Sequence, residues 1–461
     1  MKPKIQLLSQ DEIELIHSRS LDLLKSKGVR CQSKKALHYL KEAGQEVNYD
    51  TLTVKISPSL VEECLRSTPK LGEMKLCGRD EKHDFILDGS KTHYISGYGC
   101  SDVLDFENFE TGKRHPPTTI DIKNGAVIAD ALDIVDVMWV PASPVDYHPL
   151  LQNLLGDMIC FINSTKHIQD EVTDIRVVPY ILAMLDAILG NRQKLKERPI
   201  FSLIHDSMSP LQWEKTMTEG TMELAKHWVP IAIHARPQPG LTSPITSAAT
   251  LLQGNAEFLS GLVLFQLVQP GLPVIYSVSP TMVDPRSGIS VHARPEEVLM
   301  QTAAIEMARY YKLPCWQWDV SRFAQPDLDS EIGRFNNTMT LFLEKMVIDA
   351  EYYDMTTKIH KGIEVDDEHL MEDVIKRTQF GGNFLGDPTT RDRWRQECFI
   401  ATLGKHGFYQ LLGDNPSRET LNIAHERVEQ ILSNHQVKPP LPTEVVKELE
   451  MIMERAQADL T

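Results

Sequence analysis

The chain has 461 residues, of which 42% are hydrophobic and 24% are charged, as in an ordinary globular protein. Its net charge of −16 and its pI near 5.5 argue against nucleic acid or an anionic membrane as the main partner, because both require a basic surface. The seven cysteines are scattered without a Cys-x-x-Cys pair, and the chain shows neither a signal-peptide core nor a run of about 18 apolar residues. We therefore expect a cytoplasmic protein without a disulfide framework, structural zinc or a membrane span.

The first 120 residues predict a helical lead-in followed by short strands. Apolar residues recur at helical spacing behind Ser9, a good N-cap residue, and Gly28 is placed to end that helix. Two further apolar sets, at 36–40 and 60–65, predict two more helices, and strand-like runs such as 92–96 follow. We assign residues 1–120 to a lead-in and a small strand region that pack on a barrel.

From residue 121 onward, β-rich apolar runs alternate with amphipathic helical patterns, which predicts parallel strands joined by crossover helices. The expected strands are 134–140, 167–169, 199–205, 230–234, 273–278 and 314–318. The expected helices are 121–131, 149–160, 174–190, 210–227, 247–267, 295–311 and 331–348. This alternation favours an α/β fold, a (β/α)8 TIM-type barrel with its body at 121–364. Residues 365–461 are expected to be C-terminal helices that complete the barrel domain, ending in a surface helix near 445–455.

Barrel enzymes bind substrate at the C-terminal ends of their strands, and polar or aromatic residues stand at those places here. They are Trp139, His205, Asp206, His234, Arg236, Tyr276, Trp316 and Trp318. Each has a structural alternative, since tryptophans fill cores and buried histidines are often hydrogen-bonded structural residues. Cys315 is interpreted as buried rather than as a nucleophile. No zinc-protease, nucleophile-elbow or phosphate-loop motif is present, so we assign no metal ligand and no catalytic residue. A binding barrel remains as good an interpretation as an enzyme.

The order of local motifs resembles the trimethylamine methyltransferase superfamily. The matching segments are 7–9, 16–29, 97–105, 111–114, 118–121, 269–274, 282–288, 308–314, 361–363 and 381–390. This resemblance implies an enzyme of methylamine metabolism and anaerobic one-carbon metabolism, which moves a methyl group from a methylated amine to the Co(I) centre of a corrinoid protein.

The chain departs from the superfamily pattern in two places. Some members carry pyrrolysine after the strand that corresponds to 314–318, whereas residues 319–327 are ordinary here, with Gln325 at or beside the special position. This favours the non-pyrrolysine branch and a quaternary amine, with glycine betaine first. Carnitine, proline betaine, butyrobetaine, trimethylamine and a non-catalytic betaine-binding barrel stay as alternatives. The stretch 336–351 is also short, which leaves the formation of the last barrel strand open.

The resemblance also implies roles for particular residues. A quaternary nitrogen departs as a neutral amine, so the protein has only to hold the cation and aim one methyl group. Aromatic faces suit the cation, and a betaine carboxylate needs charged donors. The substrate-binding candidates are therefore Tyr98, Tyr276, Trp316, Trp318 and Phe384 for the cation, and His205, His234, Arg236 and Arg322 for the carboxylate, with Gln325 nearby. The chain lacks an Asp-x-His-x-x-Gly cobalt-ligating motif, so we expect a partner protein to supply the corrinoid, with no cofactor tightly bound here. We also expect a homo-oligomer.

Overall fold

The computed structural model describes residues 6–97, 99–283, 286, 288, 290–291, 294–317, 340–379, 383–403 and 416–461. Within these residues the core is a six-stranded sheet in which all neighbouring strands are parallel. The strand order is β14 (Val274–Val278), β13 (Ile231–Ala235), β11 (Phe201–Asp206), β10 (His167–Asp170), β9 (Val135–Trp139) and β6 (Tyr94–Ser96). A parallel bridge between Tyr276 and Cys315 adds one more segment beside β14.

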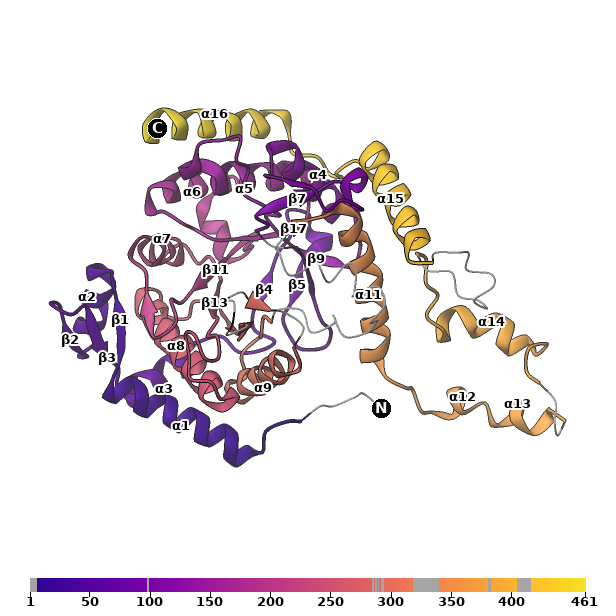
Figure 1. The fold of residues 1–461 in the computed structure, drawn as a ribbon, viewed down its shortest axis with the longest axis horizontal. Coiled ribbons are helices and arrows are strands. Elements are labelled where there is room, and N and C mark those ends of the chain that lie inside the picture. Colours follow the sequence, from indigo (N-terminus) through magenta and orange to yellow (C-terminus); the bar gives the residue numbers. More distant parts are fainter. Residues whose placement is uncertain are drawn as a thin grey trace.

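Helices alternate with these strands and lie around them, so that the fold is α/β with the parallel sheet curved into a half-barrel (Figure 1). They are α4 (Thr119–Ala131), α5 (Gln152–Asn163), α6 (Val178–Leu189), α7 (Lys215–Ala225), α8 (Ser247–Val268) and α9 (Pro295–Tyr311). Short 3₁₀ helices lie at Glu81–His83, Phe106–Asn108, Pro149–Leu151, Ile175–Val177 and Arg192–Lys196. The alternation predicted between residues 121 and 311 is confirmed.

Two boundaries differ from the prediction. The sheet includes β6, which precedes residue 121, so the parallel sheet begins inside the segment assigned to the lead-in. Strand β17 (Thr340–Leu341) pairs with β7 (Asp102–Leu104), which also pairs with β8 (Arg114–His115). Since β17 does not pair with β6 or β14, the strands that the structure describes do not close the sheet.

The lead-in consists of α1 (Gln10–Ser26), α2 (Lys34–Glu42) and α3 (Pro58–Ser67), which pack on α8. Ser9 caps α1 in a capping box with Glu12, and Gly28 follows the helix with a φ of +76°. A side chain at Gly28 would collide with the backbone of Val54, so the position requires glycine. The small sheet that the sequence did not predict joins β1 (Val29–Cys31), β2 (Glu46–Asn48) and β3 (Thr53–Lys55) to β12 (Gln212–Trp213). Further hairpins are β4 (Lys75–Leu76) with β5 (Phe85–Ile86) and β15 (Met282–Val283) with β16 (Ser290–Val291).

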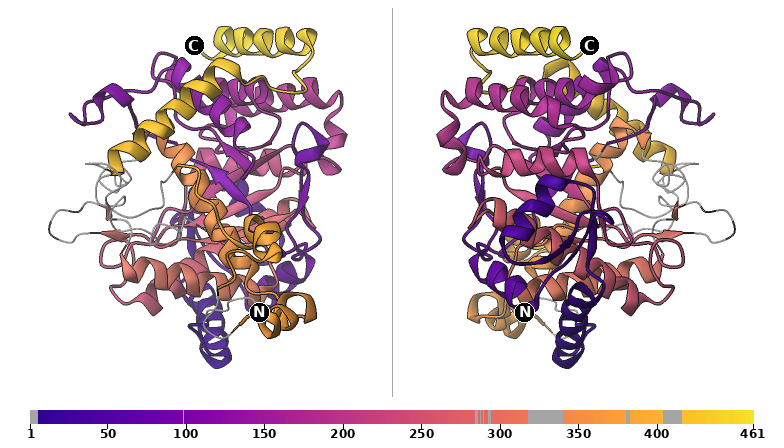
Figure 2. Two further views of the ribbon diagram at one scale, coloured as in Figure 1. Left: turned by 90° about the vertical axis from the view of Figure 1, so that its right-hand side faces the viewer. Right: turned by 90° about the vertical axis from the view of Figure 1, so that its left-hand side faces the viewer.

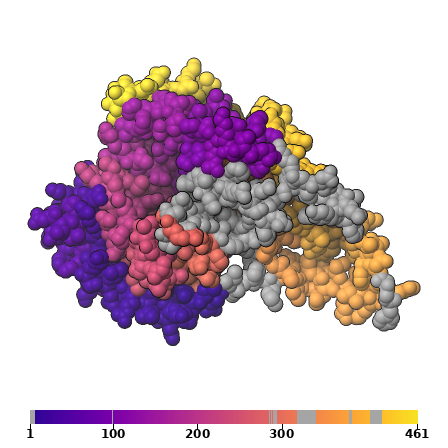
Figure 3. Space-filling view, viewed as in Figure 1, coloured from indigo at the N-terminus to yellow at the C-terminus, as the bar shows by residue number. Residues whose placement is uncertain are grey.

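The C-terminal part is helical, as predicted. Its helices are α11 (Leu343–Lys361), α12 (Asp367–Leu370), α13 (Glu372–Arg377), α14 (Pro388–Glu397), α15 (Pro416–Asn434) and α16 (Thr443–Leu460). Helix α16 packs across α5 and α6 and buries Leu449 and Ile452, so it is an outer layer of the body and not a detached surface helix (Figure 2). Helices α12 to α14, which we call the arm, project from the body (Figure 3).

Helix α8 is long and apolar enough to cross a membrane, judged by length and composition alone. However, 83% of its apolar window is buried inside the protein, between the sheet and the lead-in helices. This is the environment of a core helix in the centre of a large fold.

Candidate functional site

The ends of neighbouring strands carry polar and aromatic side chains on the inner face of the half-barrel. Side chains alternate between the two faces of a strand, so residues paired across strands point to the same side. Gln169 of β10 is paired with Trp139 of β9 and with Ser202 of β11. Asp206 lies four positions after Ser202 and is paired with His234 of β13. These side chains therefore share one face, toward the carboxyl ends where barrel enzymes hold substrates.

Trp316 reaches this face from the segment after α9. Its indole ring stands edge-on to the ring of Trp139, with centroids 5.9 Å apart, and edge-on to the ring of His234, 5.2 Å away. Trp139 belongs to β9 and His234 belongs to β13, and these two strands are separated in the sheet by β10 and β11. Trp316 therefore spans four neighbouring strands. The three rings form one aromatic cluster in the interior.

A pocket of about 90 Å³, partly open to solvent, lies beside this cluster. Trp139 and Trp316 line it together with side chains of α11, among them Tyr353 and Asp349. Asp349 is ion-paired with Lys345 of the same helix. An aromatic wall beside a carboxylate is a suitable surface for an organic cation.

His234 and Asp206 are hydrogen-bonded partners, in which Nδ1 of the buried imidazole lies 2.7 Å from Oδ1 of the partly exposed carboxylate. Burial opposes the charge of Asp206, but the charge and hydrogen bond of His234, helped by Arg236, outweigh it and hold the pKa of Asp206 below its ordinary value. Asp206 is therefore an anion at neutral pH, and it fixes the orientation of the His234 ring.

Glu171 adds a second acidic group to the mouth of the half-barrel. Burial, with the charges of Asp206 and Asp170, raises its pKa to about 8, while Arg236 acts in the opposite direction. The carboxyl groups of Glu171, Asp170 and Asp206 thus lie close together, near Arg236. Each further ionisation among them is unfavourable because like charges repel. A cationic ligand would relieve this repulsion, so the electrostatics favour a cation over an anion.

Behind Trp139 lies a pair of carboxyl groups, Asp170 and Asp157 of α5. The Trp139 indole N–H donates to Asp170 over 3.2 Å, and Asn153 donates to the other oxygen over 3.4 Å. Asp157 is fully buried, and neither of its oxygens receives a hydrogen bond from the residues that the structure describes. Burial and the charge of Asp170 raise the pKa of Asp157 well above its ordinary value, so Asp157 keeps its proton. Burial also raises the pKa of Asp170 to about 7, so the pair carries at most one negative charge, and the Asp170 carboxyl group orients Trp139.

Three of the ten substrate-binding candidates predicted from the sequence meet at this site, together with Trp139 and Asp206, which also stand at predicted strand ends. His234 and Trp316 contact each other, and Arg236 lies close enough to Asp206 and Glu171 to influence the pKa of both carboxyl groups. Tyr98, Trp318, Arg322 and Gln325 lie outside the described residues. Phe384 is exposed at the start of the segment that leads into α14, on the projecting arm (Figure 1).

The structure places the other two predicted residues on the opposite face. His205 bonds to Thr221 of α7 over 3.0 Å and stacks on Trp213 with ring centroids 5.1 Å apart. The Tyr276 hydroxyl donates to Asn255 of α8 over 3.1 Å. Both side chains are buried between the sheet and the helices, on the face opposite to Trp139 and His234. The reason is geometric, since each is one position away from a residue that points inward.

The sequence left Gln169, Asp170 and Glu171 without a role, although they close a predicted strand. In strand β10, three of the four residues of His167–Asp170 are polar. Polarity at the carboxyl end of a buried parallel strand is itself a signal for a site, because apolar residues are the rule there.

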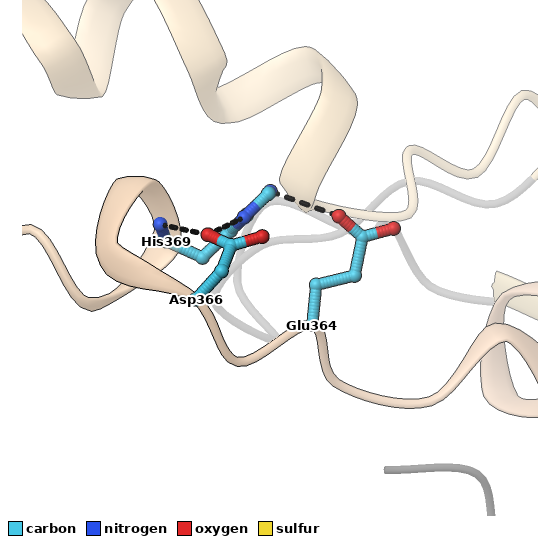
Figure 4. Close-up of side chains that lie close together, drawn as sticks. All are labelled: Glu364, Asp366 and His369. Carbon is cyan, nitrogen blue, oxygen red and sulfur yellow. Dashed lines mark hydrogen bonds and ion pairs between the residues drawn. The ribbon is translucent and has the colours of Figure 1, made fainter.

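A separate cluster on the arm joins Glu364, Asp366 and His369 (Figure 4). His369 lies between the carboxylates, with Nδ1 2.6 Å from Asp366 and Nε2 3.0 Å from Glu364. The hydrogen bond that the His369 ring donates to the Asp366 carboxylate raises the pKa of His369. Because both ring nitrogens already have carboxylate partners, an ion-paired imidazolium accounts for this exposed cluster without a metal ion.

Comparison with known proteins places the chain in a family. The family described as trimethylamine methyltransferase (MTTB) matches residues 1–324 and 331–461. The chain is 29% identical to trimethylamine methyltransferase MttB of Desulfitobacterium hafniense strain DSM 10664 / DCB-2, over 97% of this chain and 93% of that protein. It is 25% identical to glycine betaine methyltransferase of Desulfitobacterium hafniense strain Y51, over 97% and 96% of the two chains. The crystal structure of the Methanosarcina barkeri monomethylamine methyltransferase aligns with a TM-score of 0.44 at 12% identity, over 92% of each chain. The resemblance predicted from the motifs is confirmed: the chain belongs to the trimethylamine methyltransferase (MTTB) family and is a methyltransferase.

Proposed function

We propose that the protein transfers a methyl group from a quaternary amine to the Co(I) centre of a separate corrinoid protein. Membership of the family gives the class of reaction. The observation that supports a cationic substrate is the pocket wall formed by Trp139 and Trp316 beside Asp170 and the His234–Asp206 pair. The corrinoid supplies the nucleophile when its carrier docks.

The chain's own residues have three tasks in this reaction. The two indole faces hold the ammonium group, each contributing about 0.5–2 kcal/mol by cation–π attraction. The Asp206 carboxylate makes the surroundings negative, which stabilises the bound cation. The site also orients one methyl group toward the approaching partner. Because the reacting groups are already positioned, the entropy cost of reaching the transition state is smaller and the rate is higher. No proton donor is required, because a quaternary amine departs as a neutral tertiary amine.

The quaternary class rests on the ordinary residues at 319–327, and glycine betaine is its reference member. A betaine carboxylate would pair with Arg236, where it would compete with Glu171 and Asp206. A tertiary amine is the second candidate, because several relatives are named trimethylamine methyltransferases.

We also propose that the half-barrel is part of a complete (β/α)8 barrel and that the protein is a cytoplasmic homo-oligomer. The strand order and the extra parallel bridge between Tyr276 and Cys315 support the barrel. A corrinoid carried by a partner agrees with the missing cobalt-ligating motif in this sequence.

The test is methyl transfer to cob(I)alamin, followed by the loss of the cob(I)alamin absorbance, with a panel of quaternary amines and with trimethylamine. Turnover with at least one quaternary amine that exceeds turnover with trimethylamine is expected. The reverse order would contradict the quaternary assignment, and no turnover with any amine would contradict the function.

Two tryptophan variants test the site itself. Trp139→Ala and Trp316→Ala should each weaken binding of the preferred amine by roughly tenfold, the equivalent of one cation–π contact. Trp394→Ala is the matched control, because Trp394 is exposed on the arm, and it should bind as the unmodified protein does. Unchanged binding in both site variants would show that the two tryptophans are only core residues.

A further inference from the structure

A chain of hydrogen bonds begins at the buried His167 and fixes the direction of each proton along it. Nδ1 of His167 lies 3.0 Å from the carbonyl oxygen of Cys77. A carbonyl oxygen can only accept, so Nδ1 carries the hydrogen. Burial lowers the pKa of His167 to about 4, so the ring is neutral at neutral pH and Nε2 has no hydrogen. Nε2 must therefore accept from the Ser202 hydroxyl, which lies 2.8 Å away.

The next link orients the amide of Gln169. Ser202 has one hydroxyl hydrogen and gives it to His167, so its oxygen can only accept from the Gln169 side chain, 3.0 Å away. The group that faces Ser202 must be the Gln169 NH₂, because a carbonyl oxygen there would face a second acceptor. The amide is thus locked, with its carbonyl oxygen Oε1 directed away from Ser202.

This carbonyl oxygen is a buried acceptor without a donor. Gln169 is 2% exposed, and Oε1 receives no hydrogen bond from the residues that the structure describes. The Ser277 hydroxyl, paired across the sheet with His234 and therefore also on the inner face, has no partner among these residues either. Buried polar groups are rarely left unmatched, because an unmade hydrogen bond leaves the cost of removing the group from water uncompensated. An unmatched acceptor in a substrate site indicates a donor on the ligand.

The position of Gln169 ties it to the site. It is paired directly with Trp139 in the sheet, and Trp139 lines the pocket with Trp316. Neighbouring strands lie about 4.7–4.9 Å apart, so directly paired residues on one face are side by side. The acceptor therefore lies beside the aromatic wall that we propose for the ammonium group.

We propose that Gln169 is a specificity-determining residue that recognises a hydrogen-bond donor on the methylated ammonium substrate. This inference rests on the proposed methyl transfer from a methylated amine, and among the proposed substrates it favours a tertiary amine or a hydroxylated quaternary amine over glycine betaine. The donor is the N–H of a protonated tertiary amine or a hydroxyl on the alkyl arm of a quaternary amine. A quaternary amine without a hydroxyl, such as butyrobetaine or tetramethylammonium, would leave Oε1 unmatched.

Two matched ligand pairs test this by calorimetric titration of the full chain without corrinoid. Carnitine and butyrobetaine differ by one hydroxyl, and trimethylammonium and tetramethylammonium differ by an N–H in place of a methyl group. In at least one pair, the donor-bearing member should bind roughly tenfold more tightly. The pair that shows the preference identifies whether the donor is O–H or N–H.

Two variants assign the preference to Gln169. Gln169→Met keeps the length of the side chain without its acceptor, so the preference should fall to about one. Ser202→Ala leaves the acceptor but lets the amide rotate, so the preference should fall only in part. If Gln169→Met does not fold, as judged by circular dichroism, the Ser202→Ala comparison still decides the matter.

The remaining outcomes are distinct. Equal affinities within both pairs, or a preference that survives in Gln169→Met or is undiminished in Ser202→Ala, would overturn the role of Gln169 alone. Failure of all four ligands to bind would overturn this inference, whereas the proposed function is decided separately by methyl transfer with the full amine panel.

Discussion

The imidazole of His205 should make the protein sensitive to acid although it lies away from the site. It is buried between β11 and α7, and burial lowers its pKa from 6.5 to about 4. In the unfolded chain the ring has an ordinary pKa, so the unfolded state takes up the proton first as the pH falls. The free energy of unfolding therefore decreases between about pH 6.5 and pH 4. A difference of about 2.5 pKa units corresponds to about 3 kcal/mol at 1.36 kcal/mol per unit.

The perturbation that isolates this effect is His205→Phe. Phenylalanine keeps a ring against Trp213 but cannot be protonated. In urea unfolding at pH 7.5 and pH 4.5, the wild-type protein should lose about 2–3 kcal/mol more than the variant does. Thr221→Val is the control, because it removes the hydrogen bond to His205 but keeps the imidazole, and it should retain the pH dependence. An equal loss in wild-type protein and His205→Phe would refute the reasoning.

Two more substitutions test buried charges elsewhere in the fold. Lys166 is buried and donates to the backbone carbonyls of Ala129 and Leu132 at the end of α4, so Lys166→Met should lower the free energy of unfolding by about 2–4 kcal/mol. A loss below about 1 kcal/mol in chemical denaturation would show that these carbonyls find other donors. Because the pKa values of Asp157 and Asp170 are raised on folding, the stability that their protonated forms contribute is lost as the pH rises above about 4. Asp157→Asn should therefore gain stability relative to the wild-type protein as the pH increases from 5 to 9. A difference in unfolding free energy that stays constant across that range would contradict the protonation of Asp157.

Much of the fold follows from patterns that are local in the chain. The strand–helix alternation reflects periodicities of 2 and 3.6 residues, and α1 begins at a capping box that is visible as Ser9 and Glu12. Membership of the family was likewise visible in the order of short motifs. These features depend on residues that are neighbours in sequence, so the sequence alone could predict them.

Which residues meet in the site was decided by the tertiary structure. The central strands are apolar and buried on both faces, so hydrophobicity does not tell which alternate positions point inward. His205 and Asp206 are adjacent and point to opposite faces, as do Tyr276 and Ser277. Only the packing of α7 and α8 against one face decides which residue of each pair points into the half-barrel. The contact of Trp316 with Trp139 and His234, and the orientation of Gln169 by Ser202 and His167, join residues that are far apart along the chain. The amino-acid sequence thus determined the elements and the family, while the choice of face and the long-range contacts that form the site depended on how the sheet and helices pack.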